Sequence, residues 1–333
     1  MDEWPVQCFK AYDIRGLSNG DGTGELTPEF AYRLGRAMAT YLDCDAFAVG
    51  RDIRDSSPAL TRELMRGLVE GGVEVHDLGI VSTGCVYHAC WTLPVDGGVM
   101  VTASHLPMPT HNGFKMCKGT LPLAGEEIQE LKDVFLKGEF RSGEGQIRDA
   151  PHLDTYIDAI MESTGSIARP VKVAVDCGNA VPGPAMSMLL DKMGVDHVDL
   201  YCDWDATEPN HGADPTRPKN MVDLGKAVVE HGCEFGLGAD GDGDRIGAVD
   251  ETGAFVYPDP LDRIAGRRCC WHRRRKRPAD LRCQVLDERR ESHRCCRWPA
   301  NDGQNRSFVY EASVSSPSRC VDGCRNERSH LHG

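Results

Sequence analysis

The sequence lacks a long apolar run, and none of its hydrophobic stretches reaches the roughly 20 residues that span a membrane. Residues 1–5 are acidic and lack the apolar core of a signal peptide. We therefore expect a cytoplasmic protein with no membrane partner, whose cysteines stay reduced. What the chain does have, 40% hydrophobic and 27% charged residues over 333 positions, is typical of a soluble globular protein of two or more domains.

Lysine is almost absent from the last part of the chain, where the composition changes abruptly. Residues 267–333 hold 16 basic residues, 15 of them arginine, against 8 acidic ones, together with 7 of the 15 cysteines. This tail has a formal charge of +8, whereas residues 1–266 have −21. Taken alone, an arginine-rich tail favours nucleic-acid binding.

From residue 27 to residue 249, helical and strand-like stretches alternate, which predicts an α/β layer fold in two consecutive units. We expect helices at 27–42, 57–70, 82–93, 126–136, 155–162, 184–193 and 222–231, and strands at 46–50, 73–78, 98–102, 171–175, 195–201, 233–237 and 246–249. Thr27 and Ser57, each followed by proline, are expected to cap their helices. Residues 141–149, rich in glycine and charge, are expected to link the two units.

Three carboxylates stand at alternate positions in the segment 238–245, at Asp240, Asp242 and Asp244, with glycines between them. Because glycine has no Cβ, the backbone can fold tightly enough to aim the three carboxylates at one point. Clustered carboxylates repel one another unless a cation lies among them, and oxygen ligands select a hard ion such as Mg²⁺, Mn²⁺ or Ca²⁺. Arg245 follows directly and is placed to meet an anion beside the metal.

Two other interpretations of this aspartate loop remain open: a calcium-binding EF-hand and a plain acidic turn. Counted from Asp240, Glu251 stands at the twelfth position, where an EF-hand has its bidentate glutamate. However, Arg245 stands at the sixth position, where the EF-hand needs glycine, and the flanking segments are strand-like. We favour a catalytic loop that binds a divalent metal.

Ser104 follows the apolar strand expected at 98–102, and α/β folds place reactive residues in the loops directly after such strands. An ordinary turn serine is the alternative, and the Gly-x-Ser-x-Gly elbow of the α/β-hydrolases does not surround it. His105 is not expected to act as its base, because neighbouring side chains of an extended chain point in opposite directions. Lys115, where residues 112–115 turn into a strand, is either a phosphate-facing cation or a solvated strand residue.

Seven short segments, in this order along the chain, resemble the alpha-D-phosphohexomutases, and most closely the phosphomannomutase/phosphoglucomutase branch. They are FKAYDIRG at 9–16, GRD at 50–52, TASH at 102–105, NGFK at 112–115, VDCGNA at 175–180, PNHGADPTRP at 209–218 and ADGDGDR at 239–245. Any one segment could arise by chance, whereas the ordered set is specific. The resemblance implies two consecutive phosphohexomutase-type α/β domains, each a mixed sheet with flanking helices.

The resemblance also implies a reaction, the reversible conversion of a hexose 6-phosphate into the 1-phosphate of mannose or glucose. Ser104 would carry the phosphoryl group as phosphoserine, and a hexose 1,6-bisphosphate would be both intermediate and activator. Such a covalent intermediate divides one difficult migration into two transfers that need positioning and charge neutralisation. The implied site residues are Ser104, His105, Lys115 and Arg15 for catalysis, with Lys115 a candidate for proton transfer; Tyr12 and Arg245 for the phosphosugar; and Asp240, Asp242, Asp244 and a phosphoserine oxygen of Ser104 for Mg²⁺.

By this resemblance, residues 1–148 form a phosphoserine-bearing domain, 149–255 a metal-binding domain, and 256–266 the start of a third. Read one base later, the codons permitted for residues 281–289, 298–312 and 324–331 allow three further family motifs in order: FDVKCSTN, GRPMM with KTGHSFMK, and EMSGH. We therefore interpret residues 267–333 as a frameshifted, non-native tail, and expect from it neither a zinc site nor nucleic-acid binding. Because family members have four domains, an inactive truncated mutase is one alternative to an active mutase. A calcium-binding module, which follows from the EF-hand interpretation of the aspartate loop, is the other.

Overall fold

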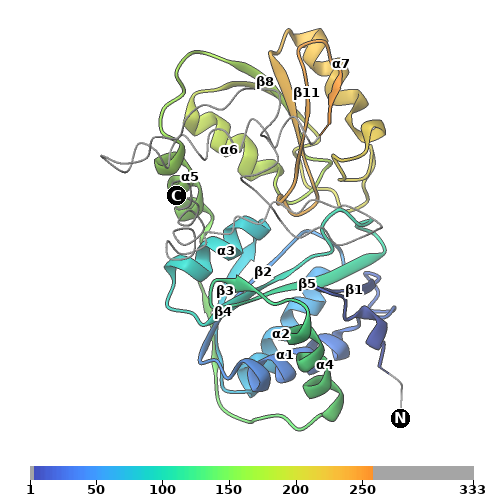
Figure 1. Ribbon diagram of the computed structural model, residues 1–333, viewed down its shortest axis with the longest axis vertical. Coiled ribbons are helices and arrows are strands. Elements are labelled where there is room, and N and C mark those ends of the chain that lie inside the picture. Colours follow the sequence, from blue (N-terminus) through green and yellow to red (C-terminus); the bar gives the residue numbers. More distant parts are fainter. Residues whose placement is uncertain (1–3, 258–333) are drawn as a thin grey trace, which may run out of the picture. The chain divides into compact units, whose positions relative to one another are not determined.

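The computed structural model describes residues 4–257, all of which belong to one compact unit. No helix in this part of the chain is long and apolar enough to cross a membrane. Two mixed sheets with flanking helices follow one another along the chain, which confirms the expected fold class (Figure 1). The expected start of a third domain, apart from residues 256 and 257, and the expected non-native tail at 267–333 lie outside the described residues.

The first sheet has the strand order β1-β5-β4-β2-β3-β7, with β6 paired to β5. The strands are β1 (Ile14–Leu17), β2 (Ala46–Arg51), β3 (Glu74–Ile80), β4 (Gly97–Val101), β5 (His111–Lys118), β6 (Leu121–Pro122) and β7 (Gln146–Asp149). The four strands β4, β2, β3 and β7 are parallel, whereas β5 is antiparallel to β1, β4 and β6. The carboxyl ends of β2, β3 and β4 therefore share one edge of the sheet.

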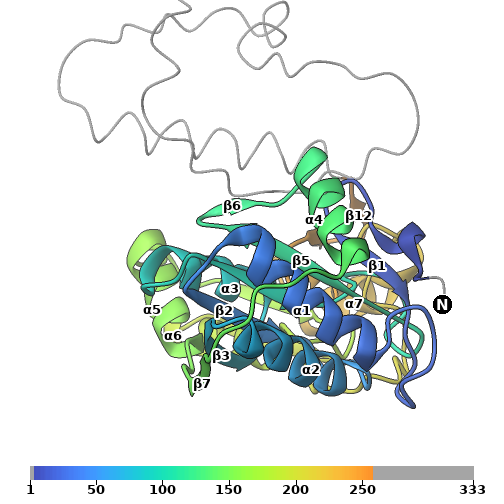
Figure 2. The same cartoon turned by 90° about the horizontal axis from the view of Figure 1, so that it is seen from below.

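Helices cover both faces of this sheet (Figure 2). One face carries α1 (Pro28–Leu42), α2 (Ser57–Glu70) and α4 (Glu126–Lys137), and the other carries α3 (Thr83–Thr92). A short 3₁₀ helix, η1 (Val6–Cys8), precedes β1.

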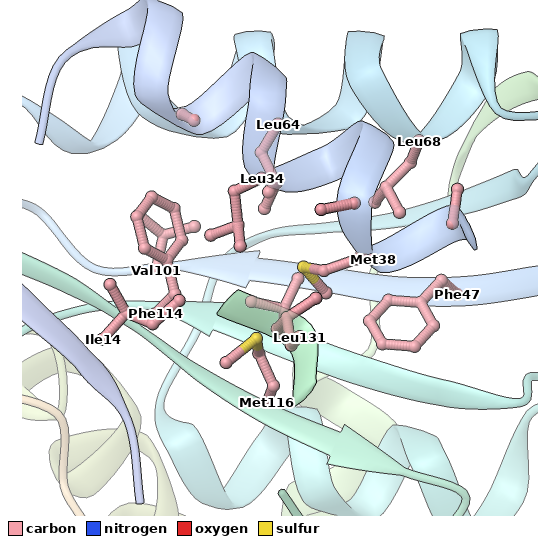
Figure 3. Close-up of a cluster of buried hydrophobic side chains, with 14 of the residues drawn as sticks. Ile14, Leu34, Met38, Phe47, Leu64, Leu68, Val101, Phe114, Met116 and Leu131 are labelled. Carbon is pink, nitrogen blue, oxygen red and sulfur yellow. The ribbon is translucent and has the colours of Figure 1, made fainter. Parts of the chain in front are cut away.

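The larger hydrophobic core of the first sheet lies beneath α1, α2 and α4 (Figure 3). Its members are buried apolar side chains from the three helices and the sheet, among them Leu34, Met38, Phe47, Leu64, Leu68, Val101, Phe114 and Leu131. Burying each such side chain stabilises the fold by about 1.5–3 kcal/mol. This core therefore fixes β4 and β5, the two strands that lead into and out of the Ser104 loop.

The second sheet has the order β12-β11-β10-β8-β9. Its strands are β8 (Lys172–Asp176), β9 (Asp196–Leu200), β10 (Phe235–Ala239), β11 (Ile246–Val249) and β12 (Phe255–Val256). Leu224 and Val228 of α7 (Val222–His231), which follows the 3₁₀ helix η2 (Pro218–Met221), pack on one face, and Leu190 of α6 (Gly183–Met193) packs on the other. Helix α5 (Leu153–Thr164) contacts α6 and also α3 of the first sheet.

The sequence predicted the N-terminal cap of α1 correctly and that of α2 incorrectly. The Thr27 side chain accepts a hydrogen bond from the Phe30 amide at 3.2 Å, which confirms it as the cap of α1. Ser57 does not cap α2: the helix begins at Ser57 and Ser56 precedes it, while the Ser57 hydroxyl donates to Asp52 Oδ1 at 2.5 Å. Because Ser57 is itself the first residue of the helix, it does not occupy the N-cap position, from which a side chain accepts amides of the first turn.

The segment expected as a linker is partly a strand. Residues 146–149 form β7, whose main chain pairs with β3 at the sheet edge, and the Arg141 guanidinium donates to the carbonyls of Gly71 and Cys44. The turn expected within residues 112–115 is likewise wrong, whereas the strand that it was expected to enter is present: residues 112–114 of β5 pair with β1, and Lys115 pairs with β4. In both places the glycines and charged residues that predicted a loop lie in or beside strands, because main-chain pairing in the sheet accommodates them.

Helices α1 and α2 touch at Gly35 and Gly67. A Cβ added at Gly67 would lie 2.2 Å from the Tyr32 carbonyl oxygen, and one at Gly35 would lie 2.2 Å from that of Leu64. We expect Gly67→Ala to lower the free energy of unfolding by about 2 kcal/mol, because forcing the helices apart costs more than the roughly 1 kcal/mol gained in helix propensity. Urea unfolding measures this.

The matched control is Arg62→Ala on the same helix, whose side chain is 70% exposed and whose replacement should change stability by no more than about 0.5 kcal/mol. A Gly67→Ala protein more stable than wild type would contradict the close approach of the two helices.

Candidate active site

Ser104 lies in a left-handed backbone conformation, with φ of 54°, three residues after β4 ends. Its side chain is completely buried, and its hydroxyl donates a hydrogen bond of 2.6 Å to Asp240 Oδ2. A non-glycine residue rarely adopts this conformation, which is found where the surroundings enforce it. Ser104 is therefore not an ordinary surface-turn serine.

The three aspartates lie in the loop between β10 and β11, which are antiparallel and form a hairpin. Asp240 and Asp242 are fully buried, Asp244 is 13% exposed at its side chain, and one oxygen from each lies within 4.8 Å of the others. Asp240 Oδ1 accepts the amides of Asp244 and Arg245, both at 3.0 Å, which folds the loop around that carboxylate. The sequence prediction that three carboxylates converge is thus borne out by the geometry.

Gly241 allows this loop to reach Ser104. A Cβ at Gly241 would lie 2.3 Å from the Ser104 carbonyl oxygen, a distance that no side chain tolerates. The requirement for glycine here comes from close backbone approach.

The EF-hand interpretation is wrong. Strands and not helices flank the loop, and Val249, two residues before Glu251, pairs with Gly236 at the end of the hairpin away from the aspartates. Glu251 is exposed. The plain acidic turn is wrong too, because two of the three carboxylates are buried.

Lys115, on β5, reaches the aspartate loop. Its ammonium donates to Asp242 Oδ2 at 2.6 Å and to Asp244 Oδ2 at 2.5 Å, and its side chain is 11% exposed, so it is not a solvated strand residue. Burial alone would lower the pKa of Lys115, but the charges of Asp242 and Asp244 outweigh it and raise the pKa above its usual value. The side chain is a fixed cation in this arrangement.

The same crowding acts on the carboxylates. Burial and the neighbouring carboxylates raise the pKa of Asp240 well above its usual value, and the pKa of Asp244 is raised for the same reasons. Burial opposes ionisation of Asp242 as well, but Lys115 and a 2.6 Å hydrogen bond from the Thr83 hydroxyl hold its pKa below the usual range. A cation among the three would favour the ionised form of each.

Two oxygen atoms fit the ligand set of such a cation. Asp242 Oδ1 and Asp244 Oδ1 are buried and have no hydrogen-bond partner among the described residues. Buried carboxylate oxygens are costly unless something pairs with them. With Asp240 they form an all-oxygen donor set, which suits a hard divalent ion such as Mg²⁺.

Arg245 and His105 form a second layer beside the loop. His105 does not face the Ser104 hydroxyl; its Nδ1 lies 2.9 Å from Arg245 Nη1. Burial, followed by the charges of Arg245 and Arg15, lowers the pKa of His105 to about 4, so the ring is neutral and Nδ1 accepts from the guanidinium. Because Ser104 is left-handed, the alternation expected for an extended chain does not apply, and the expectation that His105 is not the base of Ser104 stays a prediction.

Arg15 lies close enough to act on His105 and Asp242 electrostatically, and it pairs with the buried Asp13 at 2.5 Å. On β1 it stands opposite Gly113 of β5, two residues before Lys115. Tyr12 differs from the other predicted site residues: it is 51% exposed and makes no hydrogen bond among the described residues.

Sequence reasoning missed three residues that contact this site: Thr83, Arg54 and Asp13. Thr83 holds Asp242 twice, because its amide also donates to the Asp242 carbonyl at 3.0 Å. The rule that singled out Ser104, a polar residue soon after a buried strand, would also have found Thr83, which follows β3. Arg54 donates to the Ser104 carbonyl at 2.7 Å, and no local pattern distinguishes it from a solvated arginine.

The aspartate loop rests on the segment that contains His211. The Gly241 amide donates to the Ala213 carbonyl at 3.1 Å, and His211 contacts Asp176 Oδ2 at 3.0 Å and the Gly212 carbonyl at 3.1 Å. With both ring nitrogens facing acceptors, the doubly protonated ring is favoured. The hydrogen bond to Asp176 outweighs burial and raises the pKa of His211.

Comparison with known proteins links both sheets to one family. Residues 6–142 match the family described as phosphoglucomutase/phosphomannomutase, alpha/beta/alpha domain I, and residues 154–253 match domain II of that family. A phosphomannomutase/phosphoglucomutase of Pseudomonas aeruginosa is 42% identical over 260 residues, which is 77% of this chain and 55% of that protein. A phosphoglucomutase of Neisseria meningitidis is 40% identical over 258 residues, 75% of this chain and 54% of the relative.

Comparison with a solved structure indicates the same family. A phosphoglucomutase/phosphomannomutase family protein of Burkholderia thailandensis superimposes with a TM-score of 0.76 at 34% identity, covering 81% of this chain and 60% of that one. The chain thus spans little more than half the length of the curated relatives that it matches.

We expect His211→Gln to reduce stability more at low pH than at high pH. Because the pKa of folded His211 is raised, its contribution is complete below the unfolded value of about 6.5 and is lost as pH rises through the folded pKa. The difference in unfolding free energy between wild type and variant should therefore be larger at pH of about 5.5 than at about 8.5. Urea unfolding at both pH values measures it.

His88→Gln is the control of opposite sign, because burial lowers the pKa of His88 and its contribution is lost as pH falls. A His211→Gln difference that grows with pH would show that the ring is neutral in the folded protein.

Proposed function

The chain belongs to the phosphoglucomutase/phosphomannomutase family, and from this premise we propose that it is made to interconvert hexose 6-phosphate and hexose 1-phosphate through a phosphoserine at Ser104. The observation that carries the proposal is the 2.6 Å hydrogen bond from the Ser104 hydroxyl to Asp240, which joins the nucleophile of one sheet to the carboxylate cluster of the other. Residues 1–148 would form the phosphoserine domain and residues 149–255 the metal-binding domain.

In the first half-reaction, phosphoserine 104 gives its phosphoryl group to the free hydroxyl of a bound hexose phosphate. The Oγ–P bond breaks as the new O–P bond forms, the proton of the sugar hydroxyl passes in net to Ser104 Oγ, and a hexose 1,6-bisphosphate results. After the bisphosphate turns round, Ser104 Oγ attacks the other phosphorus and the bond from that phosphorus to the sugar oxygen breaks. The sugar oxygen takes up the proton that Ser104 gives up, and the second monophosphate leaves. The Ser104 hydroxyl donates to Asp240 Oδ2 at 2.6 Å, which places that carboxylate to receive the proton as Oγ attacks.

Asp240, Asp242 and Asp244, with one phosphoserine oxygen, would hold Mg²⁺. The buried oxygens Asp242 Oδ1 and Asp244 Oδ1 support this ligand set, since neither accepts a hydrogen bond among the described residues, although Asp244 Oδ1 lies 3.8 Å from Arg245 Nε. The ion would neutralise negative charge on the phosphoryl group and on the leaving Ser104 oxygen. The protein contributes the rigid hairpin that keeps the three carboxylates together.

Cations on both sides of the nucleophile would complete the site. We assign Lys115 chiefly to charge neutralisation, because its raised pKa makes it a poor proton donor in the arrangement seen, while proton transfer to the sugar remains its second role. Arg15 and Arg245 would bind phosphate oxygens, with neutral His105 orienting the Arg245 guanidinium at 2.9 Å. Tyr12, which is exposed, would meet the sugar.

Mannose and glucose phosphates are the proposed substrates, because one relative is named phosphomannomutase/phosphoglucomutase and another phosphoglucomutase. An inactive mutase fragment is the second candidate, and the observation that favours it is coverage of only 55% of a relative's length. An active mutase and an inactive fragment would differ in the turnover of hexose phosphate, whereas Ser104 would become phosphorylated in both. The calcium-binding module is not proposed, because the hairpin lacks EF-hand geometry.

Ser104 should become labelled when the 333-residue chain is incubated with Mg²⁺ and a hexose 1,6-bisphosphate carrying radioactive phosphate, since the nucleophile and the carboxylates are both present. Tandem mass spectrometry should place the label on Ser104, and Ser104→Ala should remove nearly all of it. Conversion of mannose 1-phosphate in the same samples separates an active mutase from a fragment limited to the half-reaction.

Ser163→Ala is the control, because this exposed serine at the end of α5 should leave labelling unchanged. Stable label on another residue, or none on wild type with Mg²⁺ present, would refute the phosphoserine proposal.

Asp242→Asn should weaken Mg²⁺ binding measured by calorimetry. Loss of an anionic ligand should cost at least the roughly 10–100-fold that loss of an outer-shell partner costs. Asp250→Asn is the matched control, because it removes the same charge beyond β11, at the other end of the hairpin. Equal affinity in the two variants would show that the metal binds elsewhere, and much tighter binding of Ca²⁺ than Mg²⁺ would argue against the catalytic assignment.

A further inference from the structure

Arg54 is a completely buried arginine in the connection between β2 and α2. A buried guanidinium is costly unless its charge is paired and all of its N–H groups have acceptors. Its Nε donates to Asp52 Oδ2 at 2.7 Å, which supplies the paired charge. The neighbouring Asp52 oxygen accepts the Arg54 amide at 3.1 Å, so the pair is fixed from both sides.

The other four N–H groups all reach backbone carbonyls of the loop 104–111, which carries the nucleophile. Nη2 donates to the carbonyls of Ser104 at 2.7 Å and Leu106 at 2.9 Å. Nη1 donates to those of Pro107 and His111, both at 3.0 Å. One side chain thus joins the beginning of the loop to its end.

The Ser104 carbonyl is the point at which this contact matters for chemistry. The left-handed conformation of Ser104 is unfavourable for a non-glycine residue and needs its neighbours to hold it. The oxygen bound by Arg54 Nη2 is also the one that Gly241 approaches so closely that a Cβ there would lie 2.3 Å away. Arg54 and the aspartate loop therefore meet at the same carbonyl, where a Cβ at Gly241 would also lie 3.8 Å from Arg54 Nη2.

We infer that Arg54 is a positioning residue for phosphoryl transfer, acting through the Ser104 main chain and not on the substrate. The inference rests on the proposed function of Ser104. Lysine cannot replace it, because an ammonium has three donors around one atom, whereas the five N–H groups of arginine spread across a plane and reach acceptors at both loop ends.

A matched variant, Arg141→Lys, distinguishes a positioning role of Arg54 from a purely structural role. Arg141 has the same kind of contacts, donating to the carbonyls of Gly71 and Cys44 and to the Asp43 carboxylate, but it lies at the edge of the first sheet away from Ser104. Arg54→Lys and Arg141→Lys should both reduce stability. Only Arg54→Lys should change the chemistry at Ser104.

The experiment measures the rate of Ser104 labelling from a radioactive hexose 1,6-bisphosphate in the 333-residue chain, as a function of donor concentration. Arg54→Lys should lower the saturating rate by roughly 10–100-fold, because a shift of about 1 Å in a reacting atom has an effect of this size. The half-saturating donor concentration should stay within about twofold, since no donor-binding group is removed. Arg141→Lys should match wild type in both.

Amide hydrogen exchange in residues 104–111 provides a readout that does not depend on catalysis. The amides of Ser104, Leu106 and His111 donate to Thr102 Oγ1, the Ala103 carbonyl and the Pro107 carbonyl, and they should exchange faster in Arg54→Lys than in Arg141→Lys. If the wild-type protein is never labelled, the proposed function has failed. Amide exchange alone then tests whether Arg54 holds the loop 104–111 in place. Unchanged exchange overturns the inference, as does a saturating rate equal to wild type.

Asp52→Asn keeps the inference testable if Arg54→Lys does not fold. It leaves the guanidinium in place and removes only its charge partner, so labelling should slow in the same direction by a smaller factor and exchange should rise in the same loop. An Asp52→Asn protein with wild-type labelling and exchange would count against Arg54 as the determinant of Ser104 position.

Discussion

Negative charge concentrated in one buried hairpin is the constraint around which this chain is arranged. Three carboxylates that share a few ångströms of dry protein would unfold the loop if nothing neutralised them. The carboxylates are paired with a lysine from β5 and accept hydrogen bonds from a threonine at the start of α3 and from two amides of the loop itself. Each of these comes from an element whose place is set by a hydrophobic core, so the packing of both sheets determines the electrostatics of the hairpin.

The second requirement is that the serine reach this charge. Ser104 comes from the first sheet and the hairpin from the second, and they meet through a hydroxyl contact on one side and a bare glycine on the other. Arg54 and His211 have comparable places in this arrangement, one behind the serine loop and one behind the hairpin. The positions of the serine loop and of the hairpin thus depend in part on two side chains outside the carboxylate cluster.

The helices, the strands and the convergence of the three aspartates were largely predictable, because apolar periodicity marks the strands and glycines between aspartates let a loop fold tightly. Ser104 was predicted from its place after a strand, but its left-handed backbone was not, since the forces that impose it come from Arg54 and Gly241, distant in sequence. Arg54 itself resembled any loop arginine until its five acceptors were visible. Residues 112–115 and 146–149 looked like loops because tertiary pairing overrides local glycine and charge.

The contact between Ser104 and Asp240 joins residues 136 positions apart in the chain. Contacts of such long range form late in folding, after local elements have already condensed, because closing a long loop is entropically costly until both ends are structured. During synthesis the first sheet is complete well before the hairpin leaves the ribosome. A nascent chain therefore holds its serine loop for some time without the carboxylates that it will face, and the reactive centre comes into existence only when the second sheet closes on the first.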